Sequence, residues 1–136
     1  MTKAAFASLQ PYVLSLLRII VGFTFCLHGF QKLFGFFGGM RGSGAKAPFF
    51  SLPWVGGVLE AFGGFLILLG LFTVPVAFIL SGEMAVAYFR VHFPTGFWPI
   101  LNRGELAVLY CFIFLYLFTA GPGQWSLDQL FRKRLT

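Results

Sequence analysis

Residues 54–72, which read WVGGVLEAFGGFLILLGLF, decide the fold. Glu60 is the only ionisable side chain in this stretch. A helix of this length is about 28 Å long at 1.5 Å per residue, which is close to the thickness of the hydrocarbon core of a bilayer. The stretch therefore predicts a transmembrane helix.

Three further apolar stretches lie on either side of it. We predict four spans in all, at residues 12–33, 53–72, 75–91 and 105–120, of which the last two are short for a bilayer. A tight turn at Thr73 and Val74 precedes Pro75, which suits the first turn of a new helix. The loops 35–53 and 93–104 are rich in glycine and aromatic residues and are expected to lie at the membrane interface. The sequence predicts a single domain over residues 1–136: an all-α integral membrane protein built as a four-helix transmembrane bundle.

The composition supports this class. Apolar residues make up 58% of the 136 residues and charged residues only 10%, whereas a soluble domain has about 25% charged residues. So few charges cannot cover a soluble surface, which excludes a soluble globular enzyme and a disordered chain. The net charge of +6 is scattered apart from one cluster at residues 132–134, so the expected partner is the lipid bilayer and not nucleic acid. Cys26 and Cys111 have no CxxC spacing and predict neither a disulfide framework nor a metal site.

The orientation depends on the basic residues. An even number of spans places both termini on one side of the membrane, and basic residues are nearly equal in number on the two sides. The cluster Arg132-Lys133-Arg134 is the densest and lies close to a span, so we expect the termini in the cytoplasm.

Charged residues inside the spans are candidates for function, because a charge in hydrocarbon is costly. Glu60 and Glu83 lie about 10–12 Å below the interface on the loop side if their helices are regular, and their short side chains cannot reach water. Arg18 lies deeper, towards the side of the termini. We expect it to be the counter-charge of a carboxylate, with Glu83 nearest in depth.

Glycines flank Glu60 on both sides. Small residues three and four positions away let a neighbouring helix approach closely. We predict that Gly22 and Gly29 of the first span supply the matching surface for the glycines at 56, 57, 63 and 64.

The loop-side half of the bundle is expected to hold a polar site. Two readings remain open: a ligand or proton-exchange site, and a structural cluster that ties loop ends to helices. For the first reading, the residues expected to exchange protons or hydrogen-bond a ligand are His28, Glu60, Glu83, His92 and Glu105, and the expected binding residues are Arg18 and Lys32. No metal is expected.

Several short motifs are similar to those of one family. Residues 18–25 (RIIVGFTF) and 28–35 (HGFQKLFG), followed by 56–64 (GGVLEAFGG) and 69–73 (LGLFT), resemble the DoxX family. Residues 102–105 (NRGE) resemble its Asn-Gly-Gly-Glu, with Arg103 in place of a glycine, and residues 121–123 and 126–128 resemble its closing segment. The resemblance covers about residues 15–130. It implies a four-helix protein of the bacterial inner membrane, from a family named after a terminal-oxidase-associated thiosulfate:quinone oxidoreductase system.

Three functions are compatible with the sequence. The first is an oxidoreductase subunit that binds a quinone as ligand and holds no covalent cofactor. The sequence has no haem ligand pair, flavin fingerprint or cysteine cluster, so the electrons would come from a partner. The second is a non-catalytic anchor or accessory subunit of a larger membrane complex or homo-oligomer. The third is a small carrier or proton pathway. Whether the chain is itself an enzyme is left open.

Overall fold

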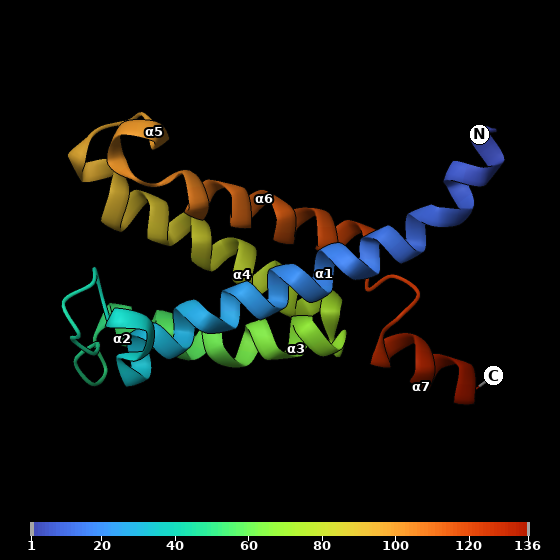
Figure 1. Cartoon of the computed structure of the whole chain (residues 1–136), viewed down its shortest axis with the longest axis horizontal. Helices are drawn as coiled ribbons and strands as arrows, with labels where there is room; N and C mark the ends of the chain where they lie inside the picture. Colours follow the sequence, from blue (N-terminus) through green and yellow to red (C-terminus); the bar gives the residue numbers. More distant parts are fainter. Residues whose placement is uncertain (1, 136) are drawn as a thin grey trace. The chain divides into compact units, whose positions relative to one another are not determined.

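The computed structural model describes residues 2–135, and Figure 1 shows that their regular structure is helical. An isolated bridge between Met40 and Ala45 is the one β-type pairing in the described residues. The helical elements are α1 (Lys3–Phe34), η1 (Phe36–Gly38), α2 (Leu52–Val58), η2 (Leu59–Gly63), α3 (Gly64–Leu69), α4 (Thr73–Ala87), η3 (Tyr88–His92), η4 (Phe93–Thr95), α5 (Pro99–Asn102), α6 (Glu105–Ala120) and α7 (Leu127–Leu135).

Within residues 2–135, three helical segments are long and apolar enough to cross a membrane: Ala5–Phe34, Leu52–Leu69 and Thr73–Thr95. The chain is therefore a membrane protein, as predicted. The fourth predicted span coincides with α6, but α6 has only 16 residues, so its length does not establish a fourth crossing or a four-helix bundle.

The helix boundaries differ from the prediction at three places. The third span, predicted as a short helix over 75–91, is a helical segment of 23 residues from Thr73 to Thr95. α1 begins at Lys3, well before residue 12, because the Thr2 side chain caps it by accepting a hydrogen bond from the Ala5 amide. The second span ends at Leu69, because Gly70 adopts a left-handed conformation (φ 67°) that terminates the helix. The turn is thus Gly70-Leu71-Phe72, and α4 begins at Thr73, with Pro75 in its first turn as expected.

The described chain divides into two compact units. Unit 1 comprises residues 2–73 and 122–135, and unit 2 comprises residues 74–121. The C-terminal segment thus returns to pack with the first two long helices.

In unit 1, α1 runs antiparallel to the helix formed by α2, η2 and α3 (Figure 1). Glycines let the two backbones touch. A Cβ atom on Gly22 would lie 2.8 Å from the Gly64 carbonyl oxygen, and one on Gly29 would lie 2.7 Å from the Gly57 carbonyl oxygen. The predicted glycine surface is confirmed, with Gly22 opposite Gly64 and Gly29 opposite Gly57.

In unit 2, α4 lies beside α6 (Figure 1). The Ser81 hydroxyl donates to the Cys111 carbonyl oxygen at 2.9 Å, and the rings of Phe78 and Phe118 lie 5.2 Å apart between centroids. The chain between them turns through η3, η4 and α5.

Candidate functional site

The Lys32–Glu60 ion pair joins the end of α1 to η2. The Lys32 Nζ donates to Glu60 Oε1 at 2.5 Å. The Glu60 side chain is only 4% exposed, whereas that of Lys32 is 30% exposed. The pair therefore connects the surface of unit 1 to a carboxylate in its interior.

The backbone around Glu60 accounts for the buried position of its side chain. Residues 59–63 form a π-helical turn, a feature that occurs mostly as an isolated bulge and often at functional sites. The glycine contacts bring α1 within backbone distance of this turn, and Cys26 Sγ donates to the Ala61 carbonyl oxygen at 3.3 Å. These contacts exclude lipid from this face of the helix, as predicted for Glu60.

The second oxygen of Glu60 is the chemically informative atom. Within residues 2–135, Oε2 is buried and has no hydrogen-bond partner. A buried polar atom without a partner costs about 1–3 kcal/mol, and such an exception calls for an explanation. A ligand hydroxyl that donates to this oxygen, or a ligand carbonyl that accepts from it when it is protonated, would remove that cost.

His28 extends the site along α1. It lies one turn before Lys32, so the two side chains project from the same face of the helix, and the Lys32 charge acts on the His28 ring. The loop after α1 is held at the same end, because the Ala47 amide donates to the Lys32 carbonyl oxygen at 2.8 Å. The structure thus brings together three predicted site residues: His28, Lys32 and Glu60.

Arg18 lies away from this group, near the opposite end of the α2–η2–α3 helix. Its side chain is 1% exposed, and its guanidinium donates to four backbone carbonyls. Nη1 binds those of Ile67 (2.5 Å) and Leu68 (2.7 Å), Nε binds that of Pro122 (2.8 Å), and Nη2 binds that of Trp125. We call these four acceptors the carbonyl cage.

The carbonyl cage explains how a buried charge is tolerated. Ile67 and Leu68 are in the last turn of α3, whose carbonyls form the negative end of the helix dipole. The Ile67 carbonyl oxygen also accepts a hydrogen bond from the Gly70 amide at 3.0 Å. The charge of Asp128 also acts on Arg18. The expected pairing of Arg18 with Glu83, which lies in unit 2, stays a prediction.

Asp128 is a residue that the sequence reasoning missed. Its carboxylate accepts hydrogen bonds from the amides of Phe72 (2.8 Å) and Thr73 (2.9 Å), and its own amide donates to the Gly70 carbonyl oxygen (2.9 Å). It therefore holds α7 against the turn before α4. The sequence does contain a signal for α7: a serine that can cap the helix, an acidic residue in the first turn and basic residues in the last turn. In the structure the Ser126 side chain caps the helix by accepting from the Gln129 amide.

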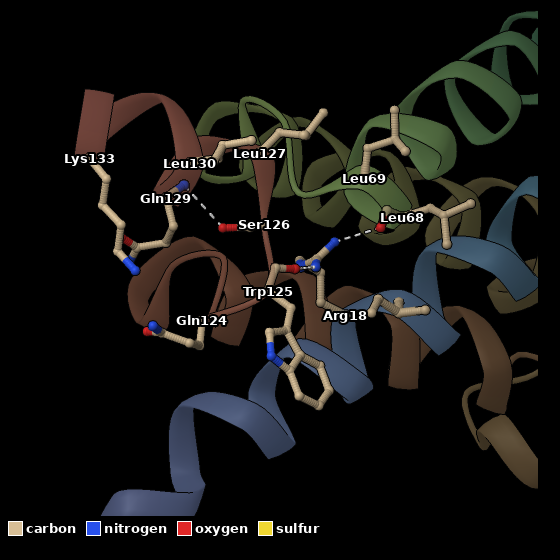
Figure 2. Close-up of a pocket in the computed structure, with 11 residues that line it drawn as sticks. Arg18, Leu68, Leu69, Gln124, Trp125, Ser126, Leu127, Gln129, Leu130 and Lys133 are labelled. Atoms are coloured by element: carbon tan, nitrogen blue, oxygen red, sulfur yellow. Dashed lines mark hydrogen bonds between the residues drawn. The ribbon is translucent and has the colours of Figure 1, made fainter. Parts of the chain in front are cut away.

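A cavity of about 440 Å³ opens beside Arg18 in unit 1 (Figure 2). Its lining comes from α1, the end of α3 and the segment leading into α7. Because it contains a predicted binding residue, it is a second candidate site, separate from the Lys32–Glu60 pair.

In unit 2, His92 belongs to a network around Asn102. His92 Nδ1 donates to the Asn102 carbonyl oxygen at 3.1 Å. The Asn102 side chain accepts from the Gly104 amide and donates to the Gly96 carbonyl oxygen, both at 2.7 Å, and Tyr88 Oη donates to the Phe97 carbonyl oxygen. This network closes the loop 93–104.

The NRGE motif acquires a structural explanation from the same loop. Arg103 has a left-handed backbone (φ 59°), the conformation that a glycine adopts most easily. A Cβ atom on Gly104 would lie 2.6 Å from Asn102 Oδ1. Glu105 is exposed in the first turn of α6, where a negative charge is favourable.

The predicted common site also included residues of unit 2. Glu83 lies within α4. It stays a prediction that Glu83, His92 and Glu105 form one site with His28.

No group of three or more His, Cys, Asp or Glu side chains suited to a metal ion occurs in the part of the chain that the structure describes. Both cysteines are free thiols.

Comparisons with known proteins place the chain among membrane proteins. The family model described as DoxX matches residues 13–93. An uncharacterized protein of Haemophilus influenzae is 46% identical, with 92% of this chain and 95% of the relative covered. No solved structure matches the chain.

Two further relatives carry membrane descriptions. An uncharacterized membrane protein of Mycobacterium tuberculosis is 33% identical, with 88% of this chain and 82% of the relative covered. The inner membrane protein YqjF of Escherichia coli is 31% identical, with 86% and 90% covered. With more than half of its residues matched by the family model and relatives that extend over nearly its whole length, the chain belongs to the DoxX family.

Proposed function

We propose that the chain is a bacterial inner-membrane subunit of a redox system, and that its Lys32–Glu60 pair binds the polar head of a quinone and exchanges a proton with it. The electrons come from a partner subunit. The observation that supports this proposal most directly is Glu60 Oε2, a buried acceptor without a donor in the described residues.

The chemistry fits the two side chains. Reduction of a quinone to a quinol takes up two electrons and two protons at its carbonyl oxygens. The Lys32 ammonium can donate a hydrogen bond to one quinone oxygen, and a protonated Glu60 can deliver a proton. Because Lys32 is 30% exposed, it can pass a replacement proton from the interface to Glu60, at 2.5 Å. His28, one turn away, is a further proton carrier.

The quinone site is tested by purifying the full chain in mild detergent and quantifying the quinone that remains bound after organic extraction. Variants Glu60→Gln and Lys32→Gln remove the proton donor and the cation, respectively. The matched control is Lys46→Gln, which makes the same change as Lys32→Gln at an exposed lysine of the loop after α1. We expect retained quinone to fall at least about tenfold in both site variants, because each loses a charge-assisted hydrogen bond worth about 1.5–3 kcal/mol, and to be unchanged in the control.

Two results would refute the proposal: a wild-type protein without bound quinone after quinone is supplied during purification, or equal retention in all four proteins. Thermal unfolding of each variant shows whether it is folded. If Lys32→Gln does not fold, Glu60→Gln decides, since glutamine has nearly the shape of glutamate and leaves Lys32, which is 30% exposed, able to turn towards water.

A second candidate is a non-catalytic accessory subunit, which the length of α6 favours. At 1.5 Å per residue, its 16 residues span about 24 Å, less than the roughly 30 Å hydrocarbon core. A partner subunit packed against unit 2 would shield the ends of such a short helix. A stoichiometric membrane partner that co-purifies with wild type and Glu60→Gln alike, without quinone, would favour this function.

A further inference from the structure

The cavity beside Arg18 has the size of a ligand site. Its volume of about 440 Å³ falls within the range of about 300–1,000 Å³ typical of small-molecule sites. Figure 2 shows polar side chains from the C-terminal segment on one side and leucines from α3 and α7 on the other. The polar lining includes Arg18, Gln124, Gln129 and Lys133, and the apolar lining includes Ile19, Leu68, Leu69 and Leu130.

The charged lining selects an anion. Arg18 and Lys133 are both cationic, and the described residues that line the cavity include no Asp or Glu. A guanidinium has five N–H donors, and the carbonyl cage uses four of them. One Nη2 hydrogen of Arg18 therefore remains for a ligand oxygen, and Lys133 brings a second cation with three donors.

The apolar lining selects a ligand with a hydrocarbon part. Leu68 and Leu69 end the membrane-crossing segment Leu52–Leu69, and Ile19 lies within Ala5–Phe34. Trp125 is 53% exposed beside them, as is typical of indole rings at a membrane interface. α7 carries exposed Leu130 and basic residues 132–134, a pattern of helices that lie on anionic membranes.

From these two halves we propose that the cavity binds one anionic phospholipid. Its phosphate lies between Arg18 and Lys133, and an acyl chain follows Ile19 and the two α3 leucines into the bilayer. Inorganic phosphate shares the chemistry of the headgroup, but it leaves the apolar half of the cavity without a ligand group.

The test is native mass spectrometry of the full chain, delipidated in a neutral detergent and then given phosphatidylglycerol or phosphatidylcholine with identical acyl chains. We expect one phosphatidylglycerol per chain to be retained in clear preference to phosphatidylcholine. Lys133→Gln should lower this retention about fivefold, the contribution of one basic group near anionic lipid. The matched control is Arg134→Gln, which removes the same charge from the same helix outside the cavity lining and should change retention less than twofold.

A third variant tests the apolar half. Leu69→Trp fills the apolar side without changing the charge and should also lower retention. Equal retention of the two lipids, equal effects of Lys133→Gln and Arg134→Gln, or full retention by Leu69→Trp would each overturn the proposal. So would displacement of the lipid by millimolar inorganic phosphate, which would identify a phosphate-ion site. Lys133 is exposed and takes no part in the carbonyl cage, so its variant leaves folding intact and stays decisive if Leu69→Trp is unstable.

Discussion

Lys32 and Glu60 form a pair of unequal burial, and this inequality predicts unequal single variants. Replacing Lys32 leaves a buried carboxylate without its cation, whereas Glu60→Gln leaves a cation that can turn towards water. We expect Lys32→Gln to destabilise the protein more than Glu60→Gln does. The double variant should lose less unfolding free energy than the two single losses added together, and the difference should be about 1–3 kcal/mol.

The measurement is a double-mutant cycle of thermal or denaturant unfolding in detergent. Additive losses would show that the 2.5 Å contact contributes no coupling energy. The outcome does not depend on quinone, so it separates the stability of the pair from its proposed chemistry.

A second prediction about a single residue concerns Arg18. Lysine keeps the charge but has no planar fork, so Arg18→Lys cannot donate to four carbonyls held in different directions. We expect a loss of about 3 kcal/mol or more in unfolding free energy, since buried carbonyls are left without donors. Arg90→Lys, the same change at an exposed residue, is the control and should lie within about 0.5 kcal/mol of wild type. Equal stability of the two variants would contradict the structural role of the carbonyl cage.

At the level of elements, the packing of α1 against α2, η2 and α3 depends on backbone contact at glycines. Gly29→Ala would place a methyl group 2.7 Å from the Gly57 carbonyl oxygen, so the helices must separate. We expect a loss of about 1–3 kcal/mol, the usual cost of overpacking.

The matched control is Gly82→Ala in α4, where an added Cβ meets no atom within 4 Å in the described structure. There the same substitution should stabilise the helix by about 0.5–1 kcal/mol, because alanine restricts the unfolded chain and favours helix. Unfolding measurements on both variants decide, and losses of equal size would show that helix spacing is not limited by Gly29.

These elements show how far the sequence predicts the fold. Glycine spacing around Glu60 predicted the α1 contact, because close approach requires the absence of a side chain. Lys32 and Glu60 were both singled out as site residues, since charge in an apolar stretch is conspicuous. The partners of Arg18 were not predictable in the same way. They are backbone carbonyls, which every residue carries, so no side-chain pattern marks them. The end of α3 at Gly70 was the available signal, because helix C-termini attract cations.

For the whole molecule, the testable property is the direction in which unit 1 crosses the membrane. Ser43 lies in the loop that follows the C-terminal end of α1, whereas Gln129 lies on α7, which is bound to Gly70 and Phe72 at the other end. Single cysteines at these two positions, in a chain with Cys26→Ala and Cys111→Ala, should react with an impermeant maleimide from opposite sides of the membrane.

We expect the cysteine at Ser43 to be labelled in intact cells and the one at Gln129 only after lysis, which corresponds to cytoplasmic termini. Labelling of both from the same side would refute the crossing of unit 1, and the reverse pattern would refute the orientation alone. A cysteine at the exposed Arg103 of unit 2 would extend the map to the loop 93–104.

The carbonyl cage also has a consequence for synthesis of the protein. Arg18 and the Pro122 carbonyl are 104 residues apart, and translation adds about 5–20 residues per second. Ile67 and Leu68 are 49 and 50 residues from Arg18, so for about the first half of this interval of roughly 5–20 seconds the nascent arginine has none of the four acceptors, and for the second half it has only the two in α3. We therefore expect chains truncated before residue 122, which lack the Pro122 and Trp125 acceptors, to be degraded faster in the membrane than the full chain.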